Sequence, residues 1–147
     1  MFPPERIIIR PPVEARSVLI PVTGGCSWNL CRFCGVYKGI QDFAVRPLED
    51  VLKDVRAAGK LYSNAPHVYL AGGNPTAAET NYLAAIIKEV KKQFPHVKRI
   101  SSYAKALDIL RKSDEELKSL AKAGLTIVYM GLESGSNTVL KYMKKKH

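Results

Sequence analysis

The chain alternates short runs of β-forming residues with amphipathic helical segments, and this alternation restricts its fold more than any other feature of the sequence. Strands that alternate with helices build a parallel sheet with right-handed crossovers. We therefore predict the α/β class, as a partial TIM-type barrel of about four βα units. Pro21 lies in the first strand, which indicates an edge strand or a bulge. The expected strands are residues 17–23, 68–71, 97–103 and 126–130.

The segments between these strands carry apolar residues at helical spacing and recognisable helix ends. Pro47 suits the first position of a helix, and Gly59 is expected to end it. The second helix is expected over about residues 77–93, before Pro95. The remaining helices are predicted at 106–110, from the capping-box sequence Ser113–Glu116 to Gly124, and after Ser136.

The composition fits one globular domain. The chain has 147 residues, of which 46% are hydrophobic and 24% charged. It contains no run of about 18 apolar residues, as a membrane span would need, and its first residues do not resemble a signal peptide. We therefore expect a cytoplasmic protein with no membrane partner. Residues 1–16 are predicted to form an N-terminal extension, and residues 17–147 the domain.

All three cysteines lie within nine residues, as Cys26, Cys31 and Cys34 in a C-x4-C-x2-C pattern. Clustered thiols in a cytoplasmic chain indicate a metal or redox site rather than a disulfide framework. A structural zinc site or an iron–sulfur cluster takes four protein ligands, so three thiolates leave one metal position open. His67 is expected at the opposite end of the sheet. A zinc site with a distant fourth ligand and three inert buried cysteines remain alternatives.

Each expected strand ends in an unusual sequence. Ligands of parallel α/β sheets bind at the carboxyl ends of the strands, so we predict that these four segments meet over one face. Taken singly, each has a plainer explanation, such as a tight turn for a glycine pair or a helix N-terminus for a glutamate. The four segments are Gly24-Gly25-Cys26, Gly72-Gly73-Asn74-Pro75, Ser101-Ser102-Tyr103 and Gly131-Leu132-Glu133-Ser134.

The segment from Gly24 to Gly39 resembles the cluster loop of radical S-adenosylmethionine (SAM) enzymes. The commonest spacing in that superfamily is C-x3-C-x2-C, and this chain has one more residue between its first two cysteines. A subset of the superfamily is similar to it in that spacing and in the Cys-x-Trp-Asn and Phe-Cys-Gly-x-Tyr-Lys-Gly surroundings. The resemblance extends from about Ile9 to Met143.

The resemblance implies a role for several residues. Cys26, Cys31 and Cys34 would bind a [4Fe-4S] cluster, and Phe33 would pack near the adenine of SAM. Gly72-Gly73-Asn74-Pro75 is similar to the Gly-Gly-Glu-Pro motif that holds the methionyl ammonium, with Asn74 in place of the acid. Glu133 resembles the residue that binds the ribose or methionyl group, and Ser102 and Tyr103 are further candidates for SAM binding.

The resemblance also implies a chemistry and a size. A reduced cluster would split SAM into methionine and a 5′-deoxyadenosyl radical that abstracts a substrate hydrogen, with flavodoxin or ferredoxin as the one-electron reductant. The substrate stays unknown. Members usually have six βα units, so we expect an incomplete radical SAM core, either an N-terminal fragment or a truncated product. Turnover by four units alone would need a partner or an oligomer to supply the missing wall.

Two other function classes remain open. A net charge of +10 is compatible with RNA as a partner or substrate, although four of the lysines lie at positions 141 and 144–146. No aromatic residues interleave a basic stripe, as base-stacking platforms would. The second alternative is a non-enzymatic module that binds zinc or an iron–sulfur cluster.

Overall fold

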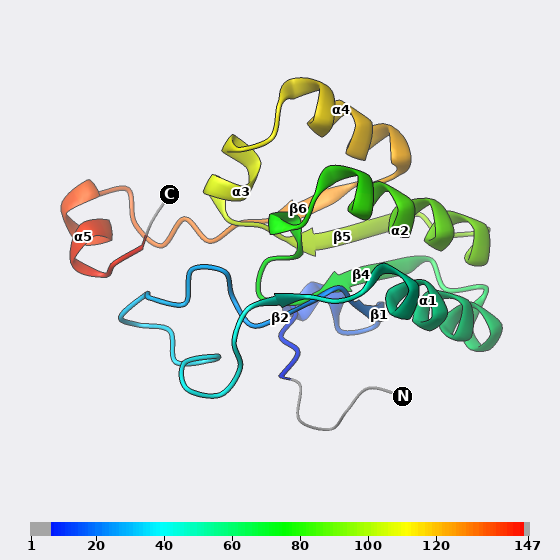
Figure 1. Cartoon of the computed structure of the whole chain (residues 1–147), viewed down its shortest axis with the longest axis horizontal. Helices are drawn as coiled ribbons and strands as arrows, with labels where there is room; N and C mark the ends of the chain where they lie inside the picture. Colours follow the sequence, from blue (N-terminus) through cyan, green and yellow to red (C-terminus); the bar gives the residue numbers. More distant parts are fainter. Residues whose placement is uncertain (1–6, 146–147) are drawn as a thin grey trace.

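The computed structural model describes residues 7–145, which form a four-stranded parallel sheet with helices on one face (Figure 1). Every neighbouring pair of strands in this sheet is parallel. The prediction of an α/β fold with parallel strands is therefore confirmed. Pro21 lies in an edge strand, as predicted. In spatial order the strands are β1 (Val18–Pro21), β4 (His67–Ala71), β5 (Arg99–Tyr103) and β6 (Ile127–Tyr129).

The three longest helices cover the same face of the sheet and enclose an aliphatic core (Figure 1). They are α1 (Leu48–Tyr62), α2 (Thr80–Gln93) and α4 (Asp114–Ala123). Val68 and Leu70 of β4 point into this core together with Ile100 of β5. The short helices are η1 (Pro12–Glu14), η2 (Pro75–Ala77), α3 (Ala106–Leu110) and α5 (Asn137–Tyr142).

The opposite face of the sheet is lined by tyrosine and serine, because successive side chains of a strand point to opposite sides. Tyr69 alternates with the core residues of β4 and is fully buried. Its ring packs edge-on against Tyr103, with 5.9 Å between the ring centroids. Tyr103 in turn packs against Tyr129 of β6 at 6.3 Å. This aromatic face forms the inner wall of the partial barrel.

A second, two-stranded antiparallel sheet was not predicted. The expected strand 17–23 stops at Pro21, and its continuation β2 (Thr23–Gly24) pairs with β3 (Ala44–Val45). Two-residue strands carry no periodicity by which a sequence could reveal them. This pair joins the two ends of residues 25–43, which we call the cysteine loop because it contains all three cysteines.

Two predicted helix boundaries were wrong. Gly59 does not end α1, which continues to Tyr62. A Cβ at Gly59 would lie 2.7 Å from the Cβ of Gln93, so this glycine allows α1 and α2 to approach closely. The second helix starts at Thr80 rather than near residue 77, because Ala78 is extended and separates η2 from α2.

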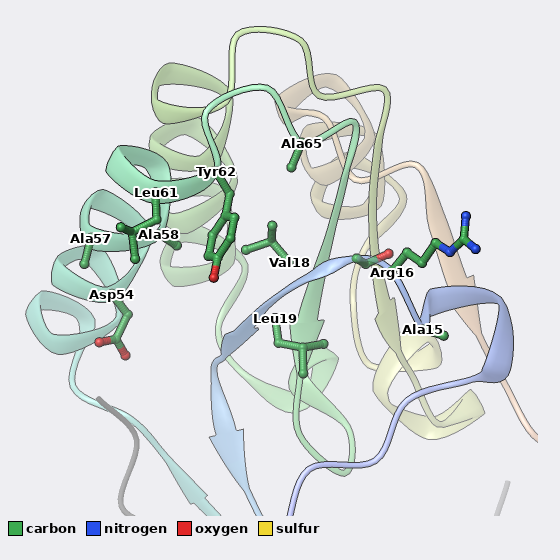
Figure 2. A pocket seen from close by; sticks show the side chains of 11 residues that line it. Ala15, Arg16, Val18, Leu19, Asp54, Ala57, Ala58, Leu61, Tyr62 and Ala65 are labelled. Carbon is green, nitrogen blue, oxygen red and sulfur yellow. The ribbon is translucent and has the colours of Figure 1, made fainter.

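An apolar groove of about 490 Å³ lies between α1 and the start of β1 (Figure 2). Val18 and Leu19 form its floor, and Leu61 and Tyr62 at the end of α1 form one wall. The groove opens toward the amino ends of the strands, where Ala65 precedes β4. Because ligand sites of parallel α/β sheets lie at the carboxyl ends, this groove is not the candidate site.

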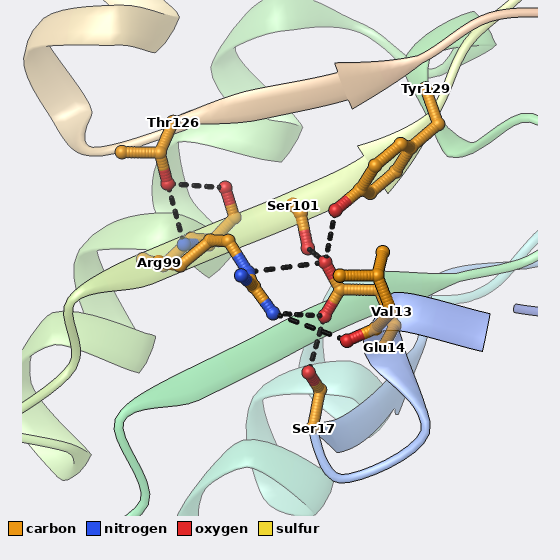
Figure 3. A network of polar contacts seen from close by, with 8 residues as sticks. Val13, Glu14, Ser17, Arg99, Ser101, Thr126 and Tyr129 are labelled. Atoms are coloured by element: carbon orange, nitrogen blue, oxygen red, sulfur yellow. Dashed lines mark hydrogen bonds and ion pairs between the residues drawn. The ribbon is translucent and has the colours of Figure 1, made fainter. Parts of the chain in front are cut away.

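The segment before β1 is anchored to the inner face of the sheet by Glu14, which is fully buried (Figure 3). Its carboxylate accepts hydrogen bonds from the hydroxyls of Ser17, Ser101 and Tyr129. The guanidinium of Arg99 forms an ion pair with it, at 3.2 Å from Nε to Oε1. Residues from β5 and β6 are thereby joined to the N-terminal segment.

Among residues 7–145, no helix is long and apolar enough to cross a membrane.

Candidate functional site

A cavity of about 370 Å³ lies at the carboxyl ends of the strands. The cysteine loop forms one wall through Cys26, Cys31 and Cys34. Gly73 after β4, Tyr103 at the end of β5 and Glu133 after β6 complete it. The cavity thus brings together all four segments that the sequence marked at strand ends.

The three cysteines share this cavity as free, partly buried thiols. Burial raises the pKa of Cys31 above its ordinary value, and negative charge on Cys26 and Cys34 raises it further. The ammonium groups of Lys145 and Lys38 oppose this rise. Within residues 7–145, no three histidine, cysteine or acidic side chains are already grouped for metal binding. Binding of one metal centre by all three thiols would require the loop to bring them closer together.

The donor set nevertheless fits an iron–sulfur cluster. Three thiolates within one cavity repel one another, and a cationic iron centre would remove that repulsion. Thiolate is the ligand type that such clusters take, and a complete set contains four. His67, which begins β4, is at the other end of that strand from the cavity. Three cysteines would therefore hold a cluster and leave one iron for another ligand.

The glycine pair after β4 allows the cysteine loop to pack directly on the sheet. Gly73 donates its backbone N–H to the carbonyl oxygen of Gly25 at 3.0 Å. A Cβ on Gly73 would overlap that oxygen, and one on Gly72 would overlap the Thr23 side chain. Gly72 also has a φ of +145°, which side chains rarely adopt. Gly73 lines the cavity, so both glycines shape its wall.

Asn74 is fully buried and its amide is already engaged by protein groups. Its Oδ1 accepts a hydrogen bond from the backbone N–H of Ser27 at 2.9 Å. Its Nδ2 donates to Ser27 Oγ at 2.8 Å and to Asp108 Oδ2 at 2.7 Å. Asn74 therefore holds the residue that follows the first cysteine, and its predicted contact with the methionyl group stays a prediction.

Ser102 and Tyr103 point to opposite sides of β5. The Ser102 hydroxyl is buried and donates to the carbonyl oxygen of Leu70 at 3.2 Å. Ser102 shares the helix-side face with Ile100, whereas Tyr103 lines the cavity. Of these two candidates for SAM binding, only Tyr103 has direct access to the cavity.

Glu133 lines the cavity in a conformation that glycine usually adopts. Its φ is +62°, in the left-handed region, and such strain is typical of functional sites. The carboxylate forms an ion pair with Lys145 at 3.3 Å. Glu133 therefore lies at the cavity, and its predicted contact with the ribose or methionyl group stays a prediction.

Phe33 and Tyr37 of the cysteine loop both line the cavity, but only Phe33 was predicted as a site residue. Phe33 lines the cavity and is half exposed, so its ring is free to pack on a ligand. Tyr37 also lines the cavity but is only 5% exposed, and its hydroxyl has no hydrogen-bond partner among residues 7–145. Burial raises the pKa of Tyr37 to about 12, so the hydroxyl is a donor. Only the tertiary packing reveals this residue.

The cysteine loop is also joined to the last described helix. The Trp28 indole N–H donates to the carbonyl oxygen of Lys144 at 2.7 Å, and the Arg32 backbone N–H donates to that of Met143 at 2.8 Å. The Arg32 guanidinium lies 4.9 Å from the ring centroid of Tyr142. These contacts hold the end of α5 and the residues that follow it against the cysteine loop, next to Lys145, which lines the cavity.

Three comparisons relate this chain to known proteins. The model of the radical SAM superfamily matches residues 20–147. A 4′-phospho-dehydrooxetanocin synthase from Priestia megaterium is 28% identical over an alignment of 141 positions, which covers 85% of this chain and 19% of that protein. The crystal structure of HydG, a maturase of the [FeFe]-hydrogenase, has the same fold, with a TM-score of 0.59 and 20% identity. That match covers 86% of this chain and 27% of HydG.

The chain therefore spans about a fifth and about a quarter of the lengths of these two proteins. The family model, in contrast, matches most of the chain, from within β1 onward. Its matched region contains every residue that lines the cavity after β1, including the three cysteines. This protein belongs to the radical SAM superfamily.

Proposed function

We propose that the chain is the cluster-binding part of a radical SAM enzyme, in which Cys26, Cys31 and Cys34 bind a [4Fe-4S] cluster. The observation that carries this proposal is that three cysteines of one loop line the same cavity as Glu133. When bound, the reduced cluster supplies the electron that splits SAM into methionine and a 5′-deoxyadenosyl radical, which abstracts a hydrogen atom from the substrate.

The cavity offers three kinds of group to SAM. Phe33 and Tyr103 provide aromatic surface on which the adenine can pack. The carboxylate of Glu133 can accept hydrogen bonds from the ribose hydroxyls or the methionyl ammonium. The Tyr37 hydroxyl, which has no partner in the described chain, can donate one hydrogen bond. In this proposal these residues bind and orient SAM.

Anaerobic reconstitution with iron and sulfide tests the proposal. We expect about four irons per chain and an electron paramagnetic resonance signal that changes when SAM is added. Stoichiometric zinc binding without a cluster would contradict the proposal and favour the non-enzymatic zinc module. A cluster whose signal is insensitive to SAM would favour a structural iron–sulfur site.

We also propose that the cysteine loop is where a one-electron reductant approaches. Leu30 is about half exposed, and the nearby side chains of Arg32 and Lys38 carry positive charge. Flavodoxin and ferredoxin are reductants of the kind that the resemblance implies. Reduction of the reconstituted cluster by either protein should slow as salt is raised, because salt screens attraction between charged surfaces. A rate independent of salt would contradict this docking.

A further inference from the structure

Asp108 is a buried carboxylate that the proposed function does not use. It lies in α3, is 3% exposed, and does not line the cavity. Its Oδ2 accepts hydrogen bonds from Asn74 Nδ2 at 2.7 Å and from the backbone N–H of Lys105 at 3.1 Å. Thr76 Oγ1 donates to the same oxygen at 3.3 Å. This carboxylate therefore holds the loop after β4 and the start of α3 together.

The Asp108 carboxylate fixes which way the Asn74 amide faces. A carboxylate only accepts hydrogen bonds, so the nitrogen of the Asn74 amide must face Asp108. The amide oxygen then faces the backbone N–H of Ser27, which can only donate, at 2.9 Å. A flipped amide would place two donors against each other at Ser27 and two acceptors against each other at Asp108. One orientation alone satisfies both neighbours.

The Ser27 N–H belongs to the peptide bond that joins Cys26 to Ser27. Asn74 Oδ1 holds this peptide, while the Gly73 N–H holds the carbonyl of Gly25 just before Cys26. The first cysteine is therefore fixed on both sides by the loop after β4. A chain of contacts thus runs from Asp108 through Asn74 to the backbone of Cys26.

We propose that Asp108 is a positioning residue for Cys26, acting through the Asn74 amide, and that it thereby controls how well the cysteine loop binds a metal. The proposal rests on the proposed function, because it assigns Cys26 to the cluster. Outer groups that orient metal ligands typically contribute 10–100-fold to metal affinity. The contact with Asp108 also explains why residue 74 is an asparagine rather than an acid. The carboxylate of an acid at this position would lie against the Asp108 carboxylate.

The first experiment uses the protein without iron. Hydrogen exchange at the Ser27 amide and alkylation of Cys26 relative to Cys34 are measured by mass spectrometry in the wild type and in Asp108→Ala. We expect exchange at Ser27 to quicken by about tenfold, since the loss of one buried hydrogen bond to a charged group changes an opening equilibrium by that order. Unchanged exchange and alkylation would overturn the proposal.

The second experiment measures iron binding after anaerobic reconstitution. Asp108→Ala is expected to weaken iron binding about tenfold, and Asp108→Asn, which keeps the shape, should weaken it less. Asn74→Asp places two carboxyl groups 2.7 Å apart and should also impair binding. The double variant N74D/D108N restores an amide–carboxylate pair and should bind more iron than N74D alone. It should remain below the wild type, because the Lys105 N–H loses its acceptor.

Glu14→Gln is the matched control, because Glu14 is another buried carboxylate with several donors, yet it makes no contact with the cysteine loop. It should lower the melting temperature while leaving Ser27 exchange and iron per folded chain unchanged. Equal changes in both variants would overturn a positioning role for Asp108. A wild type that binds no cluster would refute the proposed function alone, since the exchange measurement still decides the role of Asp108.

Discussion

Glu14 and Asp108 are both buried carboxylates with several hydrogen-bond donors, but they connect different parts of the molecule. The donors to Glu14 come mostly from strands: Arg99 and Ser101 in β5 and Tyr129 in β6. The donors to Asp108 come from the segments that follow the strands, namely Asn74, Thr76 and Lys105. The same chemistry therefore joins the scaffold at one place and the candidate site at the other.

The difference indicates that Glu14 mainly stabilises the fold, whereas Asp108 mainly orders the candidate site. Loss of Glu14 should loosen contacts between strands and the N-terminal segment, and thus lower the free energy of unfolding. Loss of Asp108 should loosen the loop after β4 and the start of α3 and, through Asn74, one peptide of the cysteine loop. Four predictions test this division, and they are arranged from the largest expected effect to the smallest.

Cys31→Ala should abolish cluster binding altogether while leaving the fold intact. Two thiolates are too few for a cluster that needs at least three protein ligands here, and Cys31 is only partly buried and outside the aliphatic core. Iron content after reconstitution and the melting temperature of the apoprotein provide the measurement. If the variant retained wild-type iron content, the cluster would have to bind elsewhere.

Glu14→Gln should reduce the free energy of unfolding by about 3 kcal/mol near pH 7, because it removes one partner of a buried ion pair and leaves Arg99 without its countercharge. Burial alone would raise the pKa of Glu14. The hydrogen bonds from Ser17, Tyr129 and Ser101 and the charge of Arg99 outweigh burial, so the pKa lies below its ordinary value of 4.5.

A lowered pKa means that the folded state resists protonation more than the unfolded chain does. The stability that Glu14 contributes is therefore complete above pH 4.5 and is lost as the pH falls through the lowered pKa. Denaturant titrations of wild type and Glu14→Gln between neutral and acid pH should converge in acid. A constant difference between them would argue against an ionised Glu14 in this network.

Gly73→Ala should destabilise the protein by about 2 kcal/mol and weaken iron binding, because the added methyl group overlaps the Gly25 carbonyl oxygen. The loop after β4 and the cysteine loop would have to separate. Gly35→Ala is the control, since a Cβ there meets nothing within 4 Å. Similar melting temperatures and iron contents for the two variants would contradict close packing at Gly73.

Tyr37→Phe should leave stability unchanged, because the hydroxyl that it removes has no hydrogen-bond partner among residues 7–145. SAM binding to the reconstituted protein should weaken about fivefold, the value of one neutral hydrogen bond. Since burial raises the pKa of Tyr37 to about 12, the effect should be the same from pH 6 to about pH 10. A large drop in stability with unchanged SAM affinity would place the hydroxyl away from the ligand.

Much of the fold could be predicted because its signals are local. Periodicity locates the four strands of the parallel sheet, and Pro21 indicated an edge strand or a bulge, of which the structure has the edge strand. The β2–β3 pair has no such signal, and Gly59 lies inside a helix, where it allows the close approach of Gln93 from another helix. A glycine that ends a helix and one that lets two helices approach look alike until the partner is known.

The candidate site, like the fold, has parts that a local sequence pattern reveals and parts that depend on contacts between distant residues. The cysteine spacing identifies the loop, but the contact between Asn74 and Asp108 joins residues far apart in sequence and leaves no local pattern. The orientation of Ser102 could have been predicted. Ile100 faces the helices, and a residue two positions further along a strand must face the same side.

The antiparallel pair β2–β3 has a consequence for how the cysteine loop rearranges. Its two ends are held together before any metal arrives, so the entropy of closing this loop has already been lost when the chain folds. Movement of the thiols toward a common centre then needs no further closure of the loop ends. The parallel sheet behind them can stay as it is, while the contacts of Ser27, Trp28 and Arg32 with the rest of the chain limit which parts of the loop move.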